Sequence, residues 1–216
     1  MEMEERQFTI RCMEFQDIPR SAEIFCEQFP ELSWTRLGES FICKLITWHY
    51  VYHPGLALVG ETDGHLIGFI VGATGGHREY YRQILRYGFP EFLQGVLLHP
   101  TLLLKRNTLT QWIDLLKSGR AVGTAKRTPG ASKTGEKKAI ICFVAVTKAA
   151  QGYGAGTSLK QAFEEAAFRE GIMLLNSYTE INNFAARRLN EKRGWKLVRE
   201  DTRRKMVYFS KRLDKD

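Results

Sequence analysis

The fold is decided by two neighbouring segments, Ala139-Ile140-Ile141-Cys142-Phe143-Val144-Ala145-Val146 and, four residues later, Gln151-Gly152-Tyr153-Gly154-Ala155-Gly156. The first is a continuous apolar run with the length of a buried strand. The second carries glycine at alternate positions, and an amphipathic helical pattern from Gly154 to Glu170 begins within it. The sequence therefore predicts a strand, a glycine-rich turn and a helix in direct succession.

A turn of this kind is suited to binding a phosphate group. Glycine allows close approach of the backbone and unusual dihedral angles, so successive N–H groups can converge on an anion beside the positive end of the helix. Spacing excludes two other phosphate motifs. A dinucleotide fingerprint needs glycine where Thr157 stands and an acidic residue where Asn176 lies, and the Gly130–Gly135 segment lacks the Lys-Ser/Thr of a P-loop.

Strands and helices alternate on both sides of this centre. An Asp-Gly pair at Asp63 and Gly64 separates two apolar runs and predicts a hairpin. The residues from Phe29 to Pro54 are more polar, and we assign no element to them. The predicted order is β-α-β-β-insertion-β-α-β-α-β-β, with these ranges outside the central segments: strand 8–12, helix from Asp17, strands 56–59 and 66–71, strand 172–178, helix 183–192, and strands 195–198 and 206–210.

Residues 75–138 form an insertion that interrupts this order. Its pattern predicts helices at 79–88, 90–98 and 108–118, followed by a Gly/Lys/Thr-rich loop. It holds twelve basic and four acidic residues, a difference that accounts for the whole net charge of +8. Because the insertion is also rich in leucine and aromatic residues, we expect an ordered, basic, helical flap over the acceptor side.

Composition and residue spacing limit the remaining possibilities. The 216 residues are sufficient for a single domain, 1–216, and contain no signal peptide or run long enough to span a membrane. The four cysteines are scattered, so we expect reduced core residues and a cytoplasmic protein. The histidines show no metal-binding spacing, and we expect no metal.

Two motifs resemble those of the GNAT acetyltransferase superfamily. Gln151–Gly156 matches its Gln/Arg-x-x-Gly-x-Gly/Ala signature, and the segment from Asn183 to Gly194-Trp195 looks like its Asn-x-x-Ala…Gly-Phe stretch. The resemblance covers 8–71 and 139–210. It implies the GNAT acyl-CoA-binding fold, an α/β (α+β) arrangement in which a central mixed, mostly antiparallel sheet is flanked by helices, here with a helical insertion between strands 3 and 4.

The resemblance also implies acetyl-CoA as cosubstrate and a set of residues that bind it. Backbone groups near the end of the apolar strand would pair with the pantetheine arm, loop amides would hold the pyrophosphate, and an asparagine side chain would reach the cofactor. These residues are Val144, Ala145, Val146, Gln151, Gly152, Tyr153, Gly154, Ala155, Gly156, Thr157 and Asn183.

The catalytic residues depart from the family pattern. The family often places a tyrosine acid at the position of Asn190, whose amide can donate a hydrogen bond to the thioester sulfur but has no proton to give. The alternative is that Asn190 is a solvent-facing helix residue. Glu180 is the first candidate for the general base and Glu61 the second. Tyr178 is a candidate substitute acid.

The predicted function is direct transfer of an acetyl group to a primary amine, on a small and anionic acceptor such as an amino sugar or sugar nucleotide. One alternative is a protein lysine or N-terminal acetyltransferase. Another is a non-catalytic acyl-CoA-binding or membrane-surface module, in which the basic insertion contacts a membrane or a second copy of the chain. Nucleic acid is not an expected partner, because the aromatic residues of the insertion are spaced for helix packing.

Overall fold

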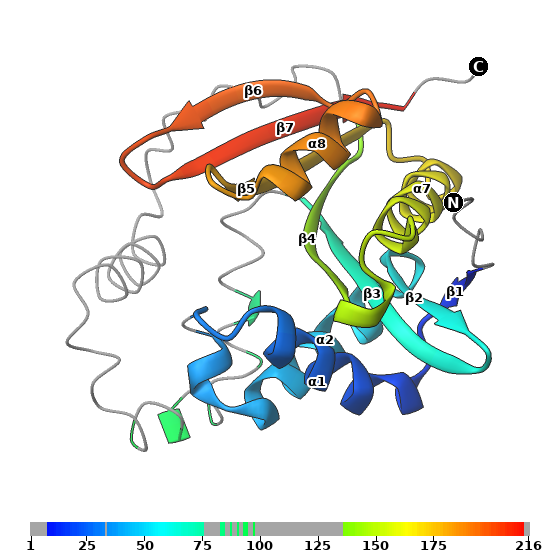
Figure 1. Cartoon of the computed structure of the whole chain (residues 1–216), viewed down its shortest axis with the longest axis vertical. Helices are drawn as coiled ribbons and strands as arrows, with labels where there is room; N and C mark the ends of the chain where they lie inside the picture. The colour runs from blue at the N-terminus through cyan, green and yellow to red at the C-terminus, as the bar shows by residue number, and fades with distance from the viewer. Residues whose placement is uncertain are drawn as a thin grey trace.

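The computed structural model describes residues 8–32, 34–75 and 136–213, together with seven single positions between 83 and 97. Seven strands form one sheet in the order β1-β2-β3-β4-β5-β7-β6 (Figure 1). Every neighbouring pair is antiparallel except β4 and β5. The predicted fold class, a mixed and mostly antiparallel sheet flanked by helices, is confirmed.

The order of the elements is the predicted one, with one addition. The strands are β1 Thr9–Cys12, β2 Ala57–Thr62, β3 His65–Thr74, β4 Lys138–Val146, β5 Leu174–Glu180, β6 Lys196–Asp201 and β7 Met206–Arg212. The helices are α1 Ile18–Gln28, α2 Glu39–Tyr52, α7 Ala155–Arg169 and α8 Phe184–Lys192. Asp63 and Gly64 both adopt positive φ, as the predicted hairpin between β2 and β3 requires.

Helix α2 is the addition, and it corrects the prediction that residues before Pro54 form no element. Its buried residues recur with helical spacing: Phe41, Ile42, Leu45, Ile46, Trp48 and His49. Glycine at position 38 has a φ of 98° and ends the preceding turn, so the helix begins directly after it. The two charged residues of this helix, Glu39 and Lys44, are exposed.

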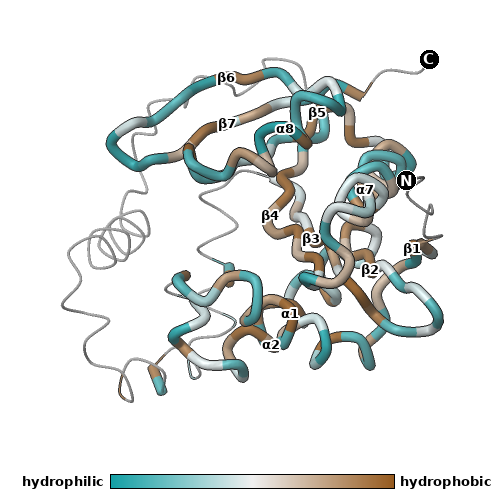
Figure 2. The backbone as a smooth tube through the Cα atoms, viewed as in Figure 1, coloured by the Kyte–Doolittle hydropathy of each residue, from teal (hydrophilic) through white to brown (hydrophobic). Residues whose placement is uncertain are grey.

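Helices cover both faces of the sheet. α1 and α2 pack on one face of β3 and β4, and α7 packs on the other face of β2, β3 and β4 (Figure 1). Each face has its own hydrophobic core, centred on Phe25 and Phe69 on the α1 side and on Leu159 and Phe163 on the α7 side. Figure 2 shows hydrophobic residues concentrated in β3 and β4 and hydrophilic residues along α8.

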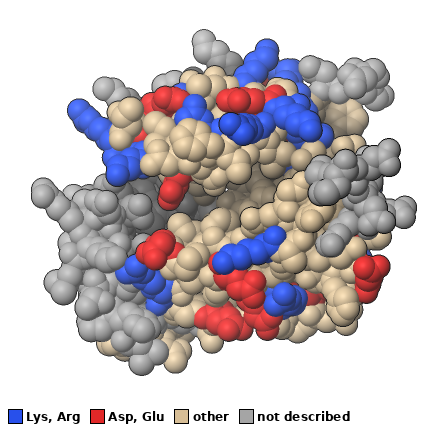
Figure 3. Space-filling view, viewed as in Figure 1, with Lys and Arg blue, Asp and Glu red and all other residues tan. Residues whose placement is uncertain are grey.

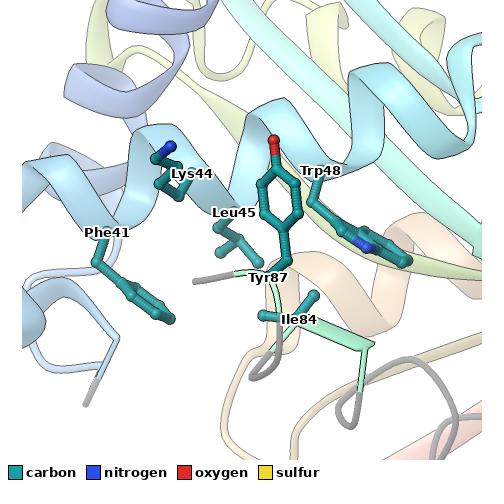
Figure 4. A pocket seen from close by; sticks show the side chains of 6 residues that line it. All are labelled: Phe41, Lys44, Leu45, Trp48, Ile84 and Tyr87. Carbon is teal, nitrogen blue, oxygen red and sulfur yellow. The ribbon is translucent and has the colours of Figure 1, made fainter. Parts of the chain in front are cut away.

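The insertion is described only in part. Most of 75–138, including the predicted helix 108–118 and nearly all of the basic loop, lies outside the described residues. Among the seven described positions, Ile84 is 2% exposed and packs with Tyr87 against α2. Figure 4 shows these two side chains facing Phe41, Leu45 and Trp48. The beginning of the insertion is therefore anchored on α2.

All four cysteines are free. Cys142 is buried, while Cys26 and Cys43 are partly buried, and burial raises the pKa of both of these thiols. Cys12 is exposed, so the expectation that all four are core residues is wrong at this position. Cys12 is the last residue of β1, an edge strand, and only one side of that strand is covered by β2.

Candidate active site

The glycine-rich segment forms the loop between β4 and α7. A short 3-10 turn, Lys148–Ala150, follows β4, and α7 begins at Ala155. Gly152 and Gly154 have φ values of 85° and 92°, in the left-handed region that other residues rarely occupy. Gly154 is also the N-cap residue of α7. The backbone conformation of the loop therefore requires glycine at positions 152 and 154.

Several backbone amides in this loop have no acceptor within the described part of the chain. The N–H of Gln151 donates to Lys148 O at 3.3 Å and that of Thr157 to Gly154 O at 2.8 Å, so both ends of the predicted cradle are already used. Four amides between them donate to no described residue: those of Gly152, Gly154, Ala155 and Gly156. Beside the positive end of α7, these are the donors that an anion needs.

The space over these glycines is open. A Cβ built at Gly152 or Gly154 would meet no described atom within 4 Å, and one at Gly156 would meet only Leu189 and Val146, both at 3.9 Å. A ligand can therefore approach the backbone closely at all three positions, and a side chain at any of them would occupy the same space. The loop fits a pyrophosphate group.

Strands β4 and β5 diverge next to this loop. They pair only through Lys138–Ile140 and Leu174–Asn176, whereas β4 remains paired with β3 as far as Val146 (Figure 1). The N–H of Thr147 donates to Ile67 O on the β3 side at 2.8 Å. Because strand residues alternate, the backbone groups of Val144 and Val146 then face the opening toward β5. An extended, amide-containing arm could pair with these groups, and binding of the pantetheine arm here stays a prediction.

A side chain connects the loop to the end of β4. Gln151 Nε2 donates to Val146 O at 3.1 Å and to Gln28 Oε1 of α1 at 2.7 Å. The residue that begins the motif therefore holds the loop against both the strand and α1. Figure 3 shows that the described surface is hollowed between the part that carries α8 and β6 and the part that carries α1.

Two of the predicted catalytic residues lie on one face of β5. Tyr178 packs against the core on the α1 side, with its ring centroid 6.4 Å from that of Tyr208. Glu180, two residues later, shares this face and is exposed at the end of the strand. Glu61, the second candidate base, lies near the end of β2, and Arg11 Nε donates to it at 3.1 Å. Arg11 forms ion pairs with both Glu61 and Asp17, so Glu61 is held in a cluster of three charged residues.

Asn190 lies elsewhere, on the α7 side of the sheet. It is 2% exposed, and its Oδ1 accepts a hydrogen bond from Lys160 Nζ of α7. The alternative that Asn190 is a solvent-facing residue is therefore wrong, because this side of α8 is closed by α7. The three predicted catalytic residues do not form one cluster. Their roles in the reaction stay a prediction.

Sequence reasoning missed Lys160, which is 3% exposed. Its Nζ lies 4.0 Å from the ring centroid of Trp195. Burial lowers the pKa of Lys160 to about 7; the charge of Glu164 opposes this shift, and those of Arg193 and Lys211 add to it. A lysine among the apolar residues of α7 was the available signal, but its partner is 30 positions away in the sequence.

Glu164 is the centre of the same buried cluster. It accepts hydrogen bonds from Arg193 Nη2, Lys211 Nζ and Trp195 Nε1, each at 2.8 Å. Burial alone would raise the pKa of Glu164, but these hydrogen bonds and the charge of Arg193 outweigh it and hold the pKa below its usual value. The cluster joins α7 to β7 and to the turn after α8.

Asn183 begins α8 as its N-cap. Its Oδ1 accepts a hydrogen bond from the N–H of Ala186 at 3.0 Å. Asparagine is among the residues preferred at this position, so the capping role could have been predicted from the sequence. Binding of the cofactor by the remaining side-chain amide stays a prediction.

The described residues contain no cluster of three or more His, Cys, Asp or Glu arranged to hold a metal ion. None of the described helices combines the length and the hydrophobicity needed to cross a bilayer.

Comparison with known proteins points to one family. Residues 77–195, more than half of the 216, match the model of the Acetyltransferase (GNAT) family. No curated protein matches the chain in sequence.

Solved structures share the fold at low sequence identity. The ribosomal-protein-S18-alanine N-acetyltransferase from Escherichia coli is 13% identical, with a TM-score of 0.56 over 97% of this chain and 96% of that one. The yncA protein from Salmonella typhimurium, solved with its cofactor acetyl-CoA, is 15% identical, with a TM-score of 0.55 over 97% and 95%. An agmatine N-acetyltransferase is 12% identical, with a TM-score of 0.59 over 95% and 99%.

Proposed function

Because the chain belongs to the GNAT acetyltransferase family, we propose that it transfers an acetyl group from acetyl-CoA directly to a primary amine. The observation that carries this proposal is the loop before α7, beside the gap between β4 and β5. Four of its N–H groups have no described acceptor, and no described atom lies closer than 3.9 Å to a Cβ built at Gly152, Gly154 or Gly156. The free cysteines support a cytoplasmic location, where thiols stay reduced.

In this proposal the loop and β4 bind the cofactor through their backbones. The amides of Gly152, Gly154, Ala155 and Gly156 hold the pyrophosphate. Val144 and Val146, which face the gap, pair with the amides of the pantetheine arm. Acetyl-CoA supplies a thioester, whose carbonyl carbon is open to attack by an amine.

The acceptor approaches from the α1 side of the sheet, where the exposed carboxylate of Glu180 ends β5. Glu180 accepts the proton that makes the attacking amine neutral. Tyr178, on the same face, is the candidate for returning a proton to the leaving sulfur. A CoA thiolate is a tolerable leaving group because the pKa of a thiol is near 8.5, so this second step contributes less to the rate.

The proposed acceptor is a small anionic amine, such as an amino sugar or sugar nucleotide. The composition of the insertion supports this choice, because residues 75–138 include twelve basic residues and only four acidic ones. The insertion leaves the sheet at Thr74 of β3 and returns at Lys138 of β4, at the end of β4 opposite to the loop that follows Val146. Enzymes of the same fold act on small amines and on proteins, so the proposal rests on charge.

The experiment is a screen for amine-dependent release of CoA thiol. Acetyl-CoA is supplied with amino sugars, sugar nucleotides that carry an amine, polyamines, and peptides with free N-termini or lysines. We expect the fastest turnover with the anionic sugars. Turnover with peptides alone would show that the acceptor is a protein or peptide and not a small anionic amine. Binding of acetyl-CoA without turnover of any amine would favour a non-catalytic module.

A further inference from the structure

The buried amine of Lys160 is unusual because it donates to no carboxylate among the described residues, although the charge of Glu164 acts on it. Its Nζ donates to the neutral carboxamide of Asn190 and lies against the ring of Trp195. An ammonium has three N–H donors and is seldom buried without a counter-ion. Among the described residues, one neutral acceptor and one aromatic ring are the contacts that this amine makes.

The cluster around Lys160 carries more positive than negative charge. Three basic side chains, Lys160, Arg193 and Lys211, share a single carboxylate, that of Glu164. Arg193 and Lys211 both contact Glu164 directly, at 2.8 Å each, which leaves Lys160 without a direct contact to this carboxylate. A buried cluster with this imbalance is stabilised by an added negative charge nearby.

The proposed phosphate cradle is one helical turn away. Lys160 follows Gly156 by four residues on α7, a rise of about 6 Å along the helix axis. Residues four apart lie on the same helical face, and Leu189, the neighbour of Asn190, is 3.9 Å from a Cβ built at Gly156. The cradle and the Lys160–Asn190 contact therefore share the α7–α8 junction. Because Lys160 is 3% exposed, salt screens its charge less than it screens that of a surface lysine.

We propose that binding of acetyl-CoA at the cradle is coupled to uptake of a proton by Lys160, whose charge then strengthens the hold on the anionic cofactor. This inference rests on the proposed function and adds a pH-dependent control of the same site. The coupled step is the transfer of one proton from solvent to Nζ, with no other bond made or broken.

The direction of the effect follows from the charges that face Lys160. In the free protein the pKa of Lys160 is about 7, so the amine is largely neutral at pH 8. Phosphate groups at the cradle favour the ammonium and raise this pKa. Acetyl-CoA therefore binds most tightly below pH 7, where Lys160 is already charged, and its affinity decreases as the pH rises through the interval between the free and bound values.

Calorimetry of acetyl-CoA binding tests the coupling without any acceptor present. Titrations at pH 8 in two buffers with different heats of ionisation give the number of protons taken up. We expect about half a proton or more for the wild type and almost none for Lys160→Met, because methionine fills the same space without an ionisable group. Lys192→Met, which removes an exposed lysine at the end of α8, should take up as many protons as the wild type.

The pH profile of affinity distinguishes this role from a structural one. We expect wild type to bind about tenfold more tightly than Lys160→Met at pH 6 and to approach it at pH 9. Lys160→Arg, which keeps a fixed charge, should bind tightly at both pH values without proton uptake, and it serves as the second variant where Lys160→Met does not fold. Below pH 7 the cofactor phosphate also titrates, but it does so equally in all variants.

Two results would overturn the inference in different ways. Equal proton uptake by wild type and Lys160→Met, with normal acetyl-CoA binding, would remove the role of Lys160 and leave the proposed function standing. Failure of the wild type to bind acetyl-CoA at any pH would remove both.

Discussion

Lys160 of α7 donates a hydrogen bond to Oδ1 of Asn190 in α8, and neither side chain is more than 3% exposed. This buried contact joins the helix that follows the glycine loop to the helix that carries the second sequence motif. The contact pairs a cation with a neutral amide, so each side chain depends on the other for its hydrogen bond.

Replacing Asn190 should therefore destabilise the fold. In Asn190→Leu the side chain keeps its size, but the Lys160 ammonium stays buried without an acceptor. We expect a loss of about 2–4 kcal/mol in the free energy of unfolding, measured by urea denaturation at pH 6.

The double variant Lys160→Met/Asn190→Leu provides the control. It removes both polar groups, and we expect it to recover at least half of the loss in Asn190→Leu. If the two single substitutions proved additive, the contact would contribute nothing to stability.

Gly156→Val should weaken cofactor binding more than it harms the fold. A Cβ at this position meets described atoms only at 3.9 Å, an ordinary contact, but the family signature accepts alanine here, so a side chain larger than alanine is needed to block the loop. We expect acetyl-CoA affinity to fall by about tenfold or more in calorimetry, whereas Gly156→Ala is the matched control and should bind nearly as well as the wild type.

The same test at Gly154 is less clean, because its φ of 92° would strain any other residue and lower stability as well. Unchanged affinity in a stable Gly156→Val protein would contradict the placement of the cofactor at this loop.

Glu180→Gln should lower turnover and leave acetyl-CoA binding unchanged. The amide keeps the shape of the side chain but cannot take up a proton, and general-base catalysis contributes typically about 10²–10⁴-fold. We expect a decrease of about a hundredfold in kcat with the best acceptor from the screen. Glu191→Gln, an exposed carboxylate of α8, is the matched control and should be fully active. Equal activities of the two variants would exclude Glu180 as the base.

The stability of the fold should fall in mild acid because of His49. This fully buried side chain donates from Nδ1 to Gly72 O at 2.8 Å, and burial lowers its pKa to about 3. Since an unfolded histidine has a pKa near 6.5, protons favour the unfolded chain as the pH falls below that value. We expect a loss of about 2 kcal/mol between pH 6.5 and pH 5, measured by urea denaturation.

His49→Asn keeps a donor at the position of Nδ1 but does not titrate, so its stability should depend less on pH over this interval. His65→Asn changes an exposed histidine of β3 and should retain the wild-type dependence. The same pH dependence in all three proteins would show that other groups are responsible.

The anchor of the insertion on α2 can be tested with two residues of that segment. Ile84 is 2% exposed, and Ile84→Ala should lower the free energy of unfolding by about 2–4 kcal/mol. Leu97 is 73% exposed, and Leu97→Ala should change it by less than about 0.5 kcal/mol. Thermal unfolding of both variants measures the difference, and similar effects would contradict the anchor.

The parts of the fold that were predictable depend on local signals. The apolar run of β4, the glycines before α7 and the Asp63-Gly64 hairpin each specify their structure within a few residues. Gly194, with a φ of 74°, ends α8 in the same way. Helix α2 was missed because its lysine, glutamate and histidine obscured a helical apolar spacing that was present.

The cluster around Asn190 could not be predicted, because no local pattern encodes it. Lys160 meets Asn190, and Glu164 meets Lys211 of β7, only after the two helices pack on the sheet. Individually, each of the three charged residues is unremarkable in an amphipathic pattern. Only the folded structure shows that several basic side chains lie around the single carboxylate of Glu164.

The proposed cradle consists of main-chain groups, which every amino acid carries. Gly152, Gly154 and Gly156 differ from other residues in having no side chain. The site is therefore specified by the space left over the backbone and not by side-chain functional groups. A substitution at the exposed Tyr153, between the first two glycines, leaves the N–H donors in place. Chains can thus differ widely in sequence and still present the same hydrogen-bonding surface, provided that the residues over it stay small.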